Sequence, residues 1–155
     1  MKQTLKILLL RLLVLALLLG GISVYLRTTA NESVTPLVKH FAKEPSLIWS
    51  KVWLTMYGYD ITFSDKDSIT FDNGYWSGTH SDRSTSFTHN AWFSNRNIEA
   101  DAGAVIGELR DLCGDYRPMG SGIVFSYDDR MVYVTLPNGL IDMVTVSLLL
   151  NPGTN

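Results

Sequence analysis

The hydrophobic pattern of the chain begins with an apolar run close to the N-terminus. No polar residue interrupts Leu12 to Leu19, and apolar residues dominate the wider stretch of residues 7–26. Because a helix needs roughly 20 apolar residues to cross a bilayer core of about 30 Å, this stretch is long enough to span a membrane. Arg11 lies near one end, where its long side chain can extend to the lipid headgroups. The leucines expected to face lipid are Leu12, Leu13, Leu15, Leu17, Leu18 and Leu19.

Two interpretations of this segment remain open, a single-pass signal anchor over residues 1–27 and a cleaved signal peptide. A cleavage site needs small residues in an Ala-x-Ala-like arrangement. The nearest candidates, Leu19-Gly20-Gly21 and Thr28-Thr29-Ala30, fit it poorly, which favours the anchor. Basic residues are denser before the apolar run than directly after it, so the positive-inside rule leaves the N-terminus in the cytoplasm. We therefore expect residues 28–155 in the periplasm of a bacterial cell, tethered to the inner membrane or released after cleavage.

A helical period follows in residues 28–58, which we expect to form a connector that packs on the domain. Thr35-Pro36 has the form of an N-cap with proline at the first helical position. A second apolar pattern at helical spacing runs from Leu47 to Met56. Trp49 and Trp53 are four residues apart and so lie on one face of this helix. That face either packs on the sheet as core or rests at the bilayer interface, where Trp is favoured.

From Asp60 onward the period changes to two, which is typical of strands. The expected strands are residues 60–63, 68–72, 75–78, 84–94, 123–127, 131–136 and 140–149. The turn at Asp72-Asn73-Gly74 is a strong hairpin signal, because Asn-Gly tolerates the positive φ angles that tight turns need. Between the fourth and fifth strands, an apolar stripe at helical spacing predicts a long helix over residues 97–113.

The order of these elements predicts an α+β fold. Tight turns imply antiparallel neighbours, so we expect one N-terminal transmembrane helix and then a small antiparallel-sheet domain, residues 59–155, covered by two or three helices. The roughly 125 residues outside the membrane are enough for one hydrophobic core. The last strand is long and apolar, and an exposed edge of that kind would aggregate, so it is expected inside the sheet or under cover.

The charge balance excludes one class of partner. Residues 28–155 carry nine Lys and Arg against fifteen Asp and Glu, a net charge of −6. A nucleic-acid-binding domain needs a basic face, so no nucleic-acid partner is expected. The same balance argues against extended contact with anionic lipid, which leaves residues 7–26 as the expected contact with the bilayer.

The single cysteine, Cys113, cannot form a disulfide within the chain. An exported domain held together by disulfides would show an even set of cysteines, so this one depends on its hydrophobic core. Cys113 ends the helical apolar stripe, where a small buried hydrophobic residue is expected. A reactive thiol or an intermolecular disulfide is the alternative.

The richest polar cluster runs from Thr79 to Asn90 and contains His80, Asp82, Arg83 and His89. Ser, His and Asp occur together, yet no Gly-x-Ser-x-Gly elbow frames a nucleophile. Eight residues separate the two histidines, a spacing that neither one helix nor one turn imposes on metal ligands. We therefore expect no metal and no cofactor, and interpret this cluster as a solvated strand and loop, or as a loop that binds another protein.

A second candidate surface is the acidic turn Asp128-Asp129, followed by Arg130. Asp is common in turns because its side chain bonds the backbone locally, so the composition alone fits a simple turn. Taken together, the sequence predicts a non-enzymatic domain that binds another protein at the membrane surface, such as an immunity or exclusion protein facing a toxin, or a subunit of an envelope complex. The alternative is a small envelope enzyme or ligand-binding protein that uses the His80–His89 loop.

Overall fold

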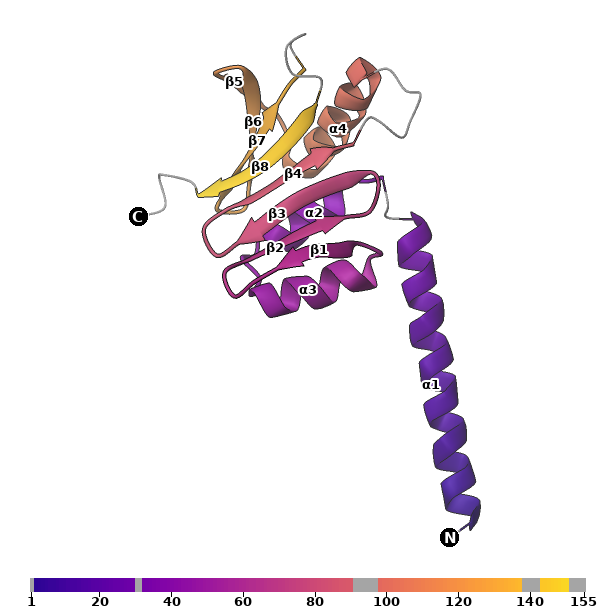
Figure 1. Cartoon of the computed structure of the whole chain (residues 1–155). Helices are drawn as coiled ribbons and strands as arrows, with labels where there is room; N and C mark the ends of the chain where they lie inside the picture. The colour runs from indigo at the N-terminus through magenta and orange to yellow at the C-terminus, as the bar shows by residue number, and fades with distance from the viewer. Residues whose placement is uncertain (1, 30–31, 91–97, 138–142, 151–155) are drawn as a thin grey trace.

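The computed structural model describes residues 2–29, 32–90, 98–137 and 143–150. It confirms the predicted α+β class: an apolar N-terminal helix precedes an eight-stranded antiparallel sheet with three further helices (Figure 1). The helices are α1 (Lys2–Thr29), α2 (Thr35–Phe41), α3 (Leu47–Met56) and α4 (Ile98–Cys113). The strands are β1 (Asp60–Ser64), β2 (Ser68–Asp72), β3 (Trp76–Ser81), β4 (Thr85–His89), β5 (Arg117–Met119), β6 (Gly122–Tyr127), β7 (Arg130–Thr135) and β8 (Val144–Leu150).

Helix α1 projects away from the domain as a separate rod (Figure 1). Its stretch Leu5–Ile22 is long and apolar enough to cross a membrane, and none of it is buried against the rest of the chain. The six leucines expected to face lipid are each more than half exposed. The helix is thus consistent with a signal anchor or a signal sequence.

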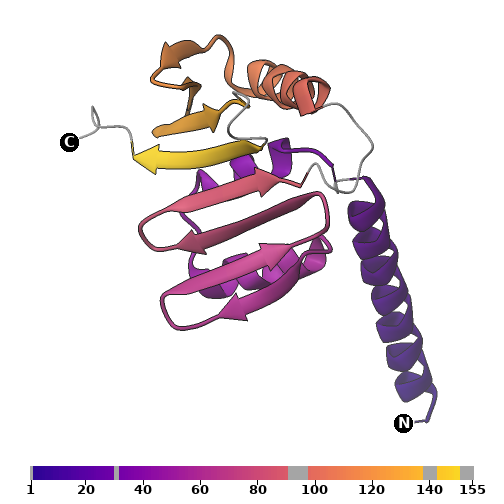
Figure 2. The same ribbon diagram turned by 45° about the horizontal axis from the view of Figure 1, so that its top comes forward.

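The sheet consists of two four-stranded meanders joined at their last strands. The strand order is β1-β2-β3-β4-β8-β7-β6-β5, and every neighbouring pair is antiparallel. A helix precedes each meander, α3 before β1 and α4 before β5, so the second half repeats the topology of the first (Figure 2). Strand β8 lies between β4 and β7, which confirms that the long apolar last strand is internal.

One face of the sheet carries the core. Phe71, Phe87, Val146 and Val134 are fully buried and follow one another across β2, β4, β8 and β7 on that face. Helices α2, α3 and α4 supply the other side of the same hydrophobic cluster. Phe41 of α2 lies over β2 and β4, with ring centroids 5.7 Å from Phe71 and 6.3 Å from Phe87. No helix in the described part of the chain covers the opposite face.

Some strand limits differ from the prediction. Strand β3 continues to Ser81 where we expected it to end at Gly78, and β4 ends at His89 where we expected Ser94. Strand β5 was not predicted, because its three residues, with Pro118 in the middle, are too few to show a period of two. The expected start of the long helix at residue 97 lies outside the described residues.

The start of α2 is held from outside the helix. The predicted N-cap at Thr35 is wrong: Val34 occupies that position and offers no side-chain hydrogen bond. The Glu108 carboxylate of α4 accepts instead from Ser33 Oγ at 2.6 Å, Val34 N at 3.0 Å, and Thr35 N and Oγ1 at 3.3 Å. Because Glu108 lies more than 70 positions from the start of α2 in the sequence, no local motif predicts this cap.

Gly78 provides a test of packing on the core face. A Cβ at this position would lie 2.7 Å from Phe87 Cβ and 2.8 Å from Phe71 Cζ. We expect Gly78→Ala to lower the free energy of unfolding by about 1–3 kcal/mol, as overpacking does, in urea unfolding of the full chain in detergent micelles.

The matched control is Gly107→Ala in α4, where an added Cβ meets nothing within 4 Å. It should stabilise the protein by up to about 1 kcal/mol, because alanine favours helix interiors over glycine. Equal stability of Gly78→Ala and wild type would contradict the close approach of β3 to its aromatic neighbours.

Candidate functional site

The polar cluster from Thr79 to Asn90 lies on a hairpin, with more of it in strands than we expected. Strands β3 and β4 contain most of it, and only residues 82–84 form the turn. In the β3–β4 register His80 pairs with Thr85, whereas His89 pairs with Trp76 at the other end. Four residues of strand, about 13 Å, therefore separate the two histidines. The hairpin therefore does not bring the two histidines together.

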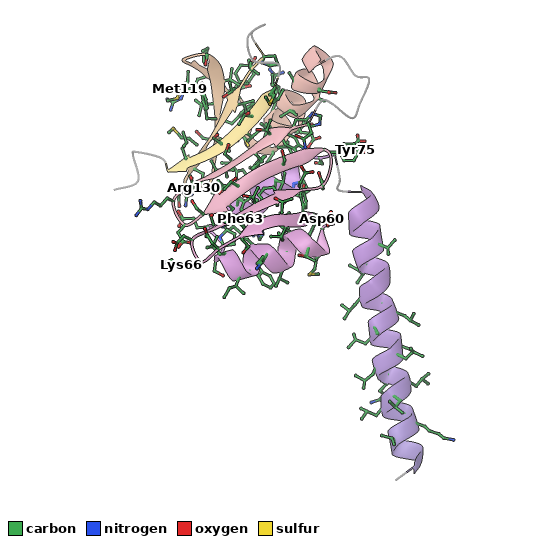
Figure 3. All side chains as sticks on the ribbon, in the orientation of Figure 1. Asp60, Phe63, Lys66, Tyr75, Met119 and Arg130 are labelled. Atoms are coloured by element: carbon green, nitrogen blue, oxygen red, sulfur yellow. The ribbon has the colours of Figure 1, made fainter. Side chains whose placement is uncertain are left out.

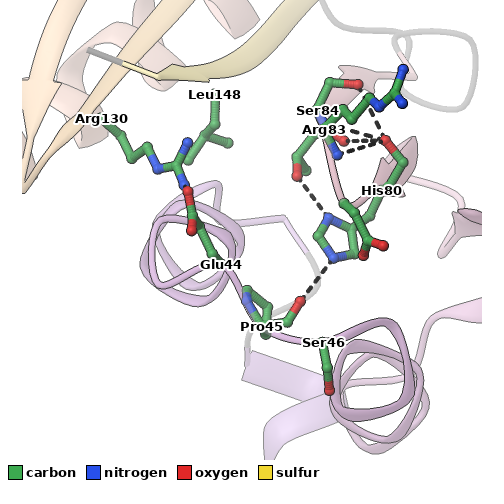
Figure 4. Close-up of a pocket in the computed structure, with 11 residues that line it drawn as sticks. Glu44, Pro45, Ser46, His80, Arg83, Ser84, Arg130 and Leu148 are labelled. Carbon is green, nitrogen blue, oxygen red and sulfur yellow. Dashed lines mark hydrogen bonds and ion pairs between the residues drawn. The ribbon is translucent and has the colours of Figure 1, made fainter. Parts of the chain in front are cut away.

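A pocket of about 360 Å³ gathers four of the predicted residues (Figure 4). His80, Asp82 and Arg83 line it from the β3–β4 hairpin, and Arg130 lines it from β7. The segment Glu44 to Ser46, between α2 and α3, forms the opposite wall. Asp128 and Asp129 do not line the pocket. They are exposed in the β6–β7 turn, where Asp128 adopts a positive φ of 50°.

His80 acts as a structural bridge in this pocket. Its Nδ1 lies 2.8 Å from Thr85 Oγ1, and its Nε2 lies 3.2 Å from the Pro45 carbonyl oxygen. A carbonyl can only accept, so we assign the proton to Nε2, and Nδ1 then accepts from the Thr85 hydroxyl. Burial lowers the pKa of His80, although the Pro45 carbonyl and Asp82 act in the opposite direction. Both ring nitrogens are thus engaged, and His80 ties the β3–β4 hairpin to the connection between α2 and α3.

An ion pair that the sequence analysis missed closes one side of the pocket. Arg130 contacts the carboxylate of Glu44, which adopts a positive φ of 48° in the connection between α2 and α3 (Figure 4). Arg83, in contrast, is exposed in the hairpin turn. The pocket is lined by two carboxylates, Glu44 and Asp82, and by two arginines, so its formal charges balance. This balance suits a polar ligand better than a highly charged one.

His89 belongs to a second, separate cluster. Its Nδ1 lies 3.9 Å from Asp101 Oδ2 of α4, and its ring meets Trp76 edge-on at 4.9 Å. Asp101 is almost fully buried and was not among the predicted residues. A signal existed, because Asp101 is a charged residue on the apolar stripe of that helix. Among the described residues, no group of three or more His, Cys, Asp and Glu could hold a metal ion.

Burial shifts the pKa of two further titratable groups, His40 and Cys113. The His40 ring stacks on Trp53 with centroids 4.1 Å apart, and its Nε2 lies 3.3 Å from Ser50 Oγ. Burial, with smaller contributions from His80 and Lys43, lowers the pKa of His40 to about 4. Burial also raises the pKa of Cys113 to about 11, so this thiol stays protonated at neutral pH and resembles a small hydrophobic residue more than a reactive one.

The bridging role of His80 predicts a loss of stability when its ring is removed. We expect His80→Ala to destabilise the protein by about 1–3 kcal/mol, because buried hydrogen-bonding groups lose their partners. The measurement is the thermal melt of the full chain in detergent. Asp82→Ala, two residues away and exposed, is the control and should leave the melt unchanged; equal melts for both variants would refute the bridge.

The lowered histidine pKa values predict that stability falls in mild acid. Below pH 6.5 the unfolded chain binds protons at His40 that the folded protein does not bind until about pH 4. The free energy of unfolding should therefore fall between these limits, by up to about 1.4 kcal/mol per pH unit for each such histidine.

Urea unfolding at several pH values checks this expectation. His40→Gln removes the titrating ring, so its stability should depend less steeply on pH than that of wild type over the same range. Carboxylates titrate in both proteins, and the difference between the two curves isolates His40. Parallel curves would show that His40 is not held neutral.

Compared with known proteins, the chain matches no family model, no curated protein and no solved structure.

Proposed function

We propose that the chain is a membrane-anchored, non-catalytic binding protein whose domain lies outside the cytoplasm and captures another protein at the membrane surface. The observation that carries this proposal is the division of the sheet into two unlike faces. All three domain helices belong to the core on one face, and the other face is left open within the described structure.

The open face is built from hydroxyl side chains. Its positions alternate with the core residues along β2, β3, β4, β8 and β7, and the hydroxyl-bearing ones are Ser68, Thr70, Ser77, Thr79, Ser81, Ser86, Thr88, Tyr133, Thr135, Thr145 and Ser147. Five of them, Thr70, Thr79, Ser86, Ser147 and Tyr133, form one row across five strands, roughly 19 Å long at the usual strand spacing.

These hydroxyls are organised by the strand pairing. Ser147 Oγ donates to Ser86 Oγ at 3.3 Å, and the hydroxyls of Thr88 and Thr145 lie 3.1 Å apart. A sheet face with many donors and acceptors and few charges suits a broad polar contact with another folded surface better than a small ligand, which needs a concave site.

The anchor supports the same proposal. Tethering raises the effective concentration of the domain at one surface, which helps only if the partner is present or arrives there. The excess of basic residues before the apolar run supports a cytoplasmic N-terminus and a periplasmic domain at the inner membrane. A delivered toxin met by an immunity or exclusion protein, or a neighbouring envelope subunit, meets these conditions.

A second candidate is the binding of a small polar ligand in the pocket of His80, Arg83 and Arg130. Its volume of about 360 Å³ falls within the range of ligand sites. An enzymatic version of this alternative would use His80, whose Nδ1 contacts the Thr85 hydroxyl and whose Nε2 contacts the Pro45 carbonyl.

The open-face proposal predicts that one bulky cation disrupts binding. In affinity purification from gently solubilised native membranes, we expect full-length wild type to retain one stoichiometric partner. Thr79→Arg, within the hydroxyl row and exposed, should reduce its recovery at least about tenfold, because an unpaired buried charge at an interface is costly.

Ala104→Arg is the matched control, since it adds the same charge at an exposed position on α4. It should keep the partner, and both variants should melt like wild type. If Thr79→Arg retained the partner, the contact would not lie on the open face. Absence of any stoichiometric partner would refute the binding function.

A further inference from the structure

Helix α3 carries apolar side chains on two sides. Its inner side buries Ser50 and Leu54 completely. Its outer side exposes Ile48 (79 %), Trp49 (58 %), Val52 (45 %) and Met56 (44 %), which together we name the α3 stripe. The two tryptophans of α3 therefore differ in their surroundings. Trp53, with Tyr57 and His40 stacked beside it, packs on the domain, whereas Trp49 faces outward.

The α3 stripe lies where α1 meets the domain. Helix α3 runs crosswise to α1 at the end of the domain nearest to it, and the two helices contact each other (Figures 1 and 2). With 28 residues, α1 is about 42 Å long, whereas the hydrocarbon core of a bilayer is about 30 Å thick. If α1 spans the bilayer, its last turns reach the headgroup layer, and α3 lies beside them at the same depth.

The charge of the segment that contains α2 and α3 is opposite to that of the domain as a whole. The segment of α2 and α3 contains Lys39, Lys43 and Lys51, all exposed, and its one acidic residue is Glu44, which is paired with Arg130. The net charge of −6 for residues 28–155 therefore does not describe this side.

A groove of about 430 Å³ between α2 and α3 combines these cations with aromatic rings. Lys39, Lys43, Trp49, Trp53 and Tyr57 line it, and no acidic residue does. Trp and Tyr favour the headgroup level of a bilayer, and lysines near the surface are attracted to anionic lipids. Through Trp49, the groove is continuous with the α3 stripe.

We propose that α3 is an interfacial helix: the α3 stripe inserts into the outer headgroup and acyl boundary beside α1, with Lys39 and Lys43 against phospholipid phosphates. This inference rests on the proposed function only in requiring that α1 is retained as a membrane anchor. An amphipathic helix that lies in the interface plane buries its apolar side by this means. The occupant of the stripe is then the lipid surface.

This arrangement sets the orientation of the whole domain. Strand β1 adjoins α3 and is nearest to the bilayer, and β5 lies at the far edge of the sheet (Figure 3, where Phe63 of β1 and Met119 of β5 are labelled). The open face then stands sideways to the membrane and remains accessible to a partner.

Nitroxide labels on the full chain in nanodiscs containing anionic phospholipid test the proposal. In a Cys113→Ser background, one variant carries the label at Val52→Cys in the stripe. The matched control carries it at Met119→Cys, a residue that is equally exposed at 45 % but lies on the far edge. Quenching by lipid-soluble oxygen and by a water-soluble nickel complex reports the depth of each label.

We expect oxygen to dominate at position 52 and the nickel complex to dominate at position 119. A water-exposed label at position 52 would overturn the proposal. Shielding from both quenchers would also overturn it, because a second copy or another protein would then cover the stripe. Lys39→Glu with Lys43→Glu should raise nickel access at position 52 several-fold, and unchanged depth would exclude the role of the lysines.

The intact mass of the purified chain separates this inference from the proposed function. A mass without α1 would overturn both the anchor and the interfacial helix. With α1 retained, the depth measurement decides the role of α3 regardless of whether a protein partner is captured.

Discussion

The carboxylate of Glu108 holds the point where the chain passes from α1 into the domain. It accepts four hydrogen bonds from Ser33 to Thr35, and Trp76 Nε1 of β3 donates to the Glu32 carbonyl directly before them. These contacts fix the first turn of α2, and α2 in turn places Phe41 over the sheet. The packing of the core therefore depends on these few hydrogen bonds.

The rest of the architecture follows from covering one face of the sheet and not the other. Three helices on the core face leave their own outer surfaces and the far side of the sheet to make external contacts. The domain thus has an apolar and basic side at α3 and a hydroxyl-rich side on the sheet. Because these two surfaces belong to different elements, contact with a bilayer and contact with a protein need not compete.

Much of the fold could be read from local patterns, and the errors have a common physical cause. The strand at 131–136 was found because its buried valines alternate with Tyr133 and Thr135, and the strand at 123–127 is a short, largely apolar run between turns. The end of β3 was missed because its core positions, Gly78 and His80, are not apolar side chains and hide the alternation. The Glu44–Arg130 contact joins distant segments, and a single sequence contains no local signal for such a pair.

The position of β8 determines how the two halves can assemble. It is the last described strand, yet it pairs with β4 and β7 at the middle of the sheet. During synthesis the first meander has only local contacts to make, whereas β4 and β7 both present unpaired edges until β8 arrives. Closing such a long-range pairing is slow compared with forming hairpins. Losing the final strand would therefore leave β4 and β7 unpaired and separate the two halves of the sheet.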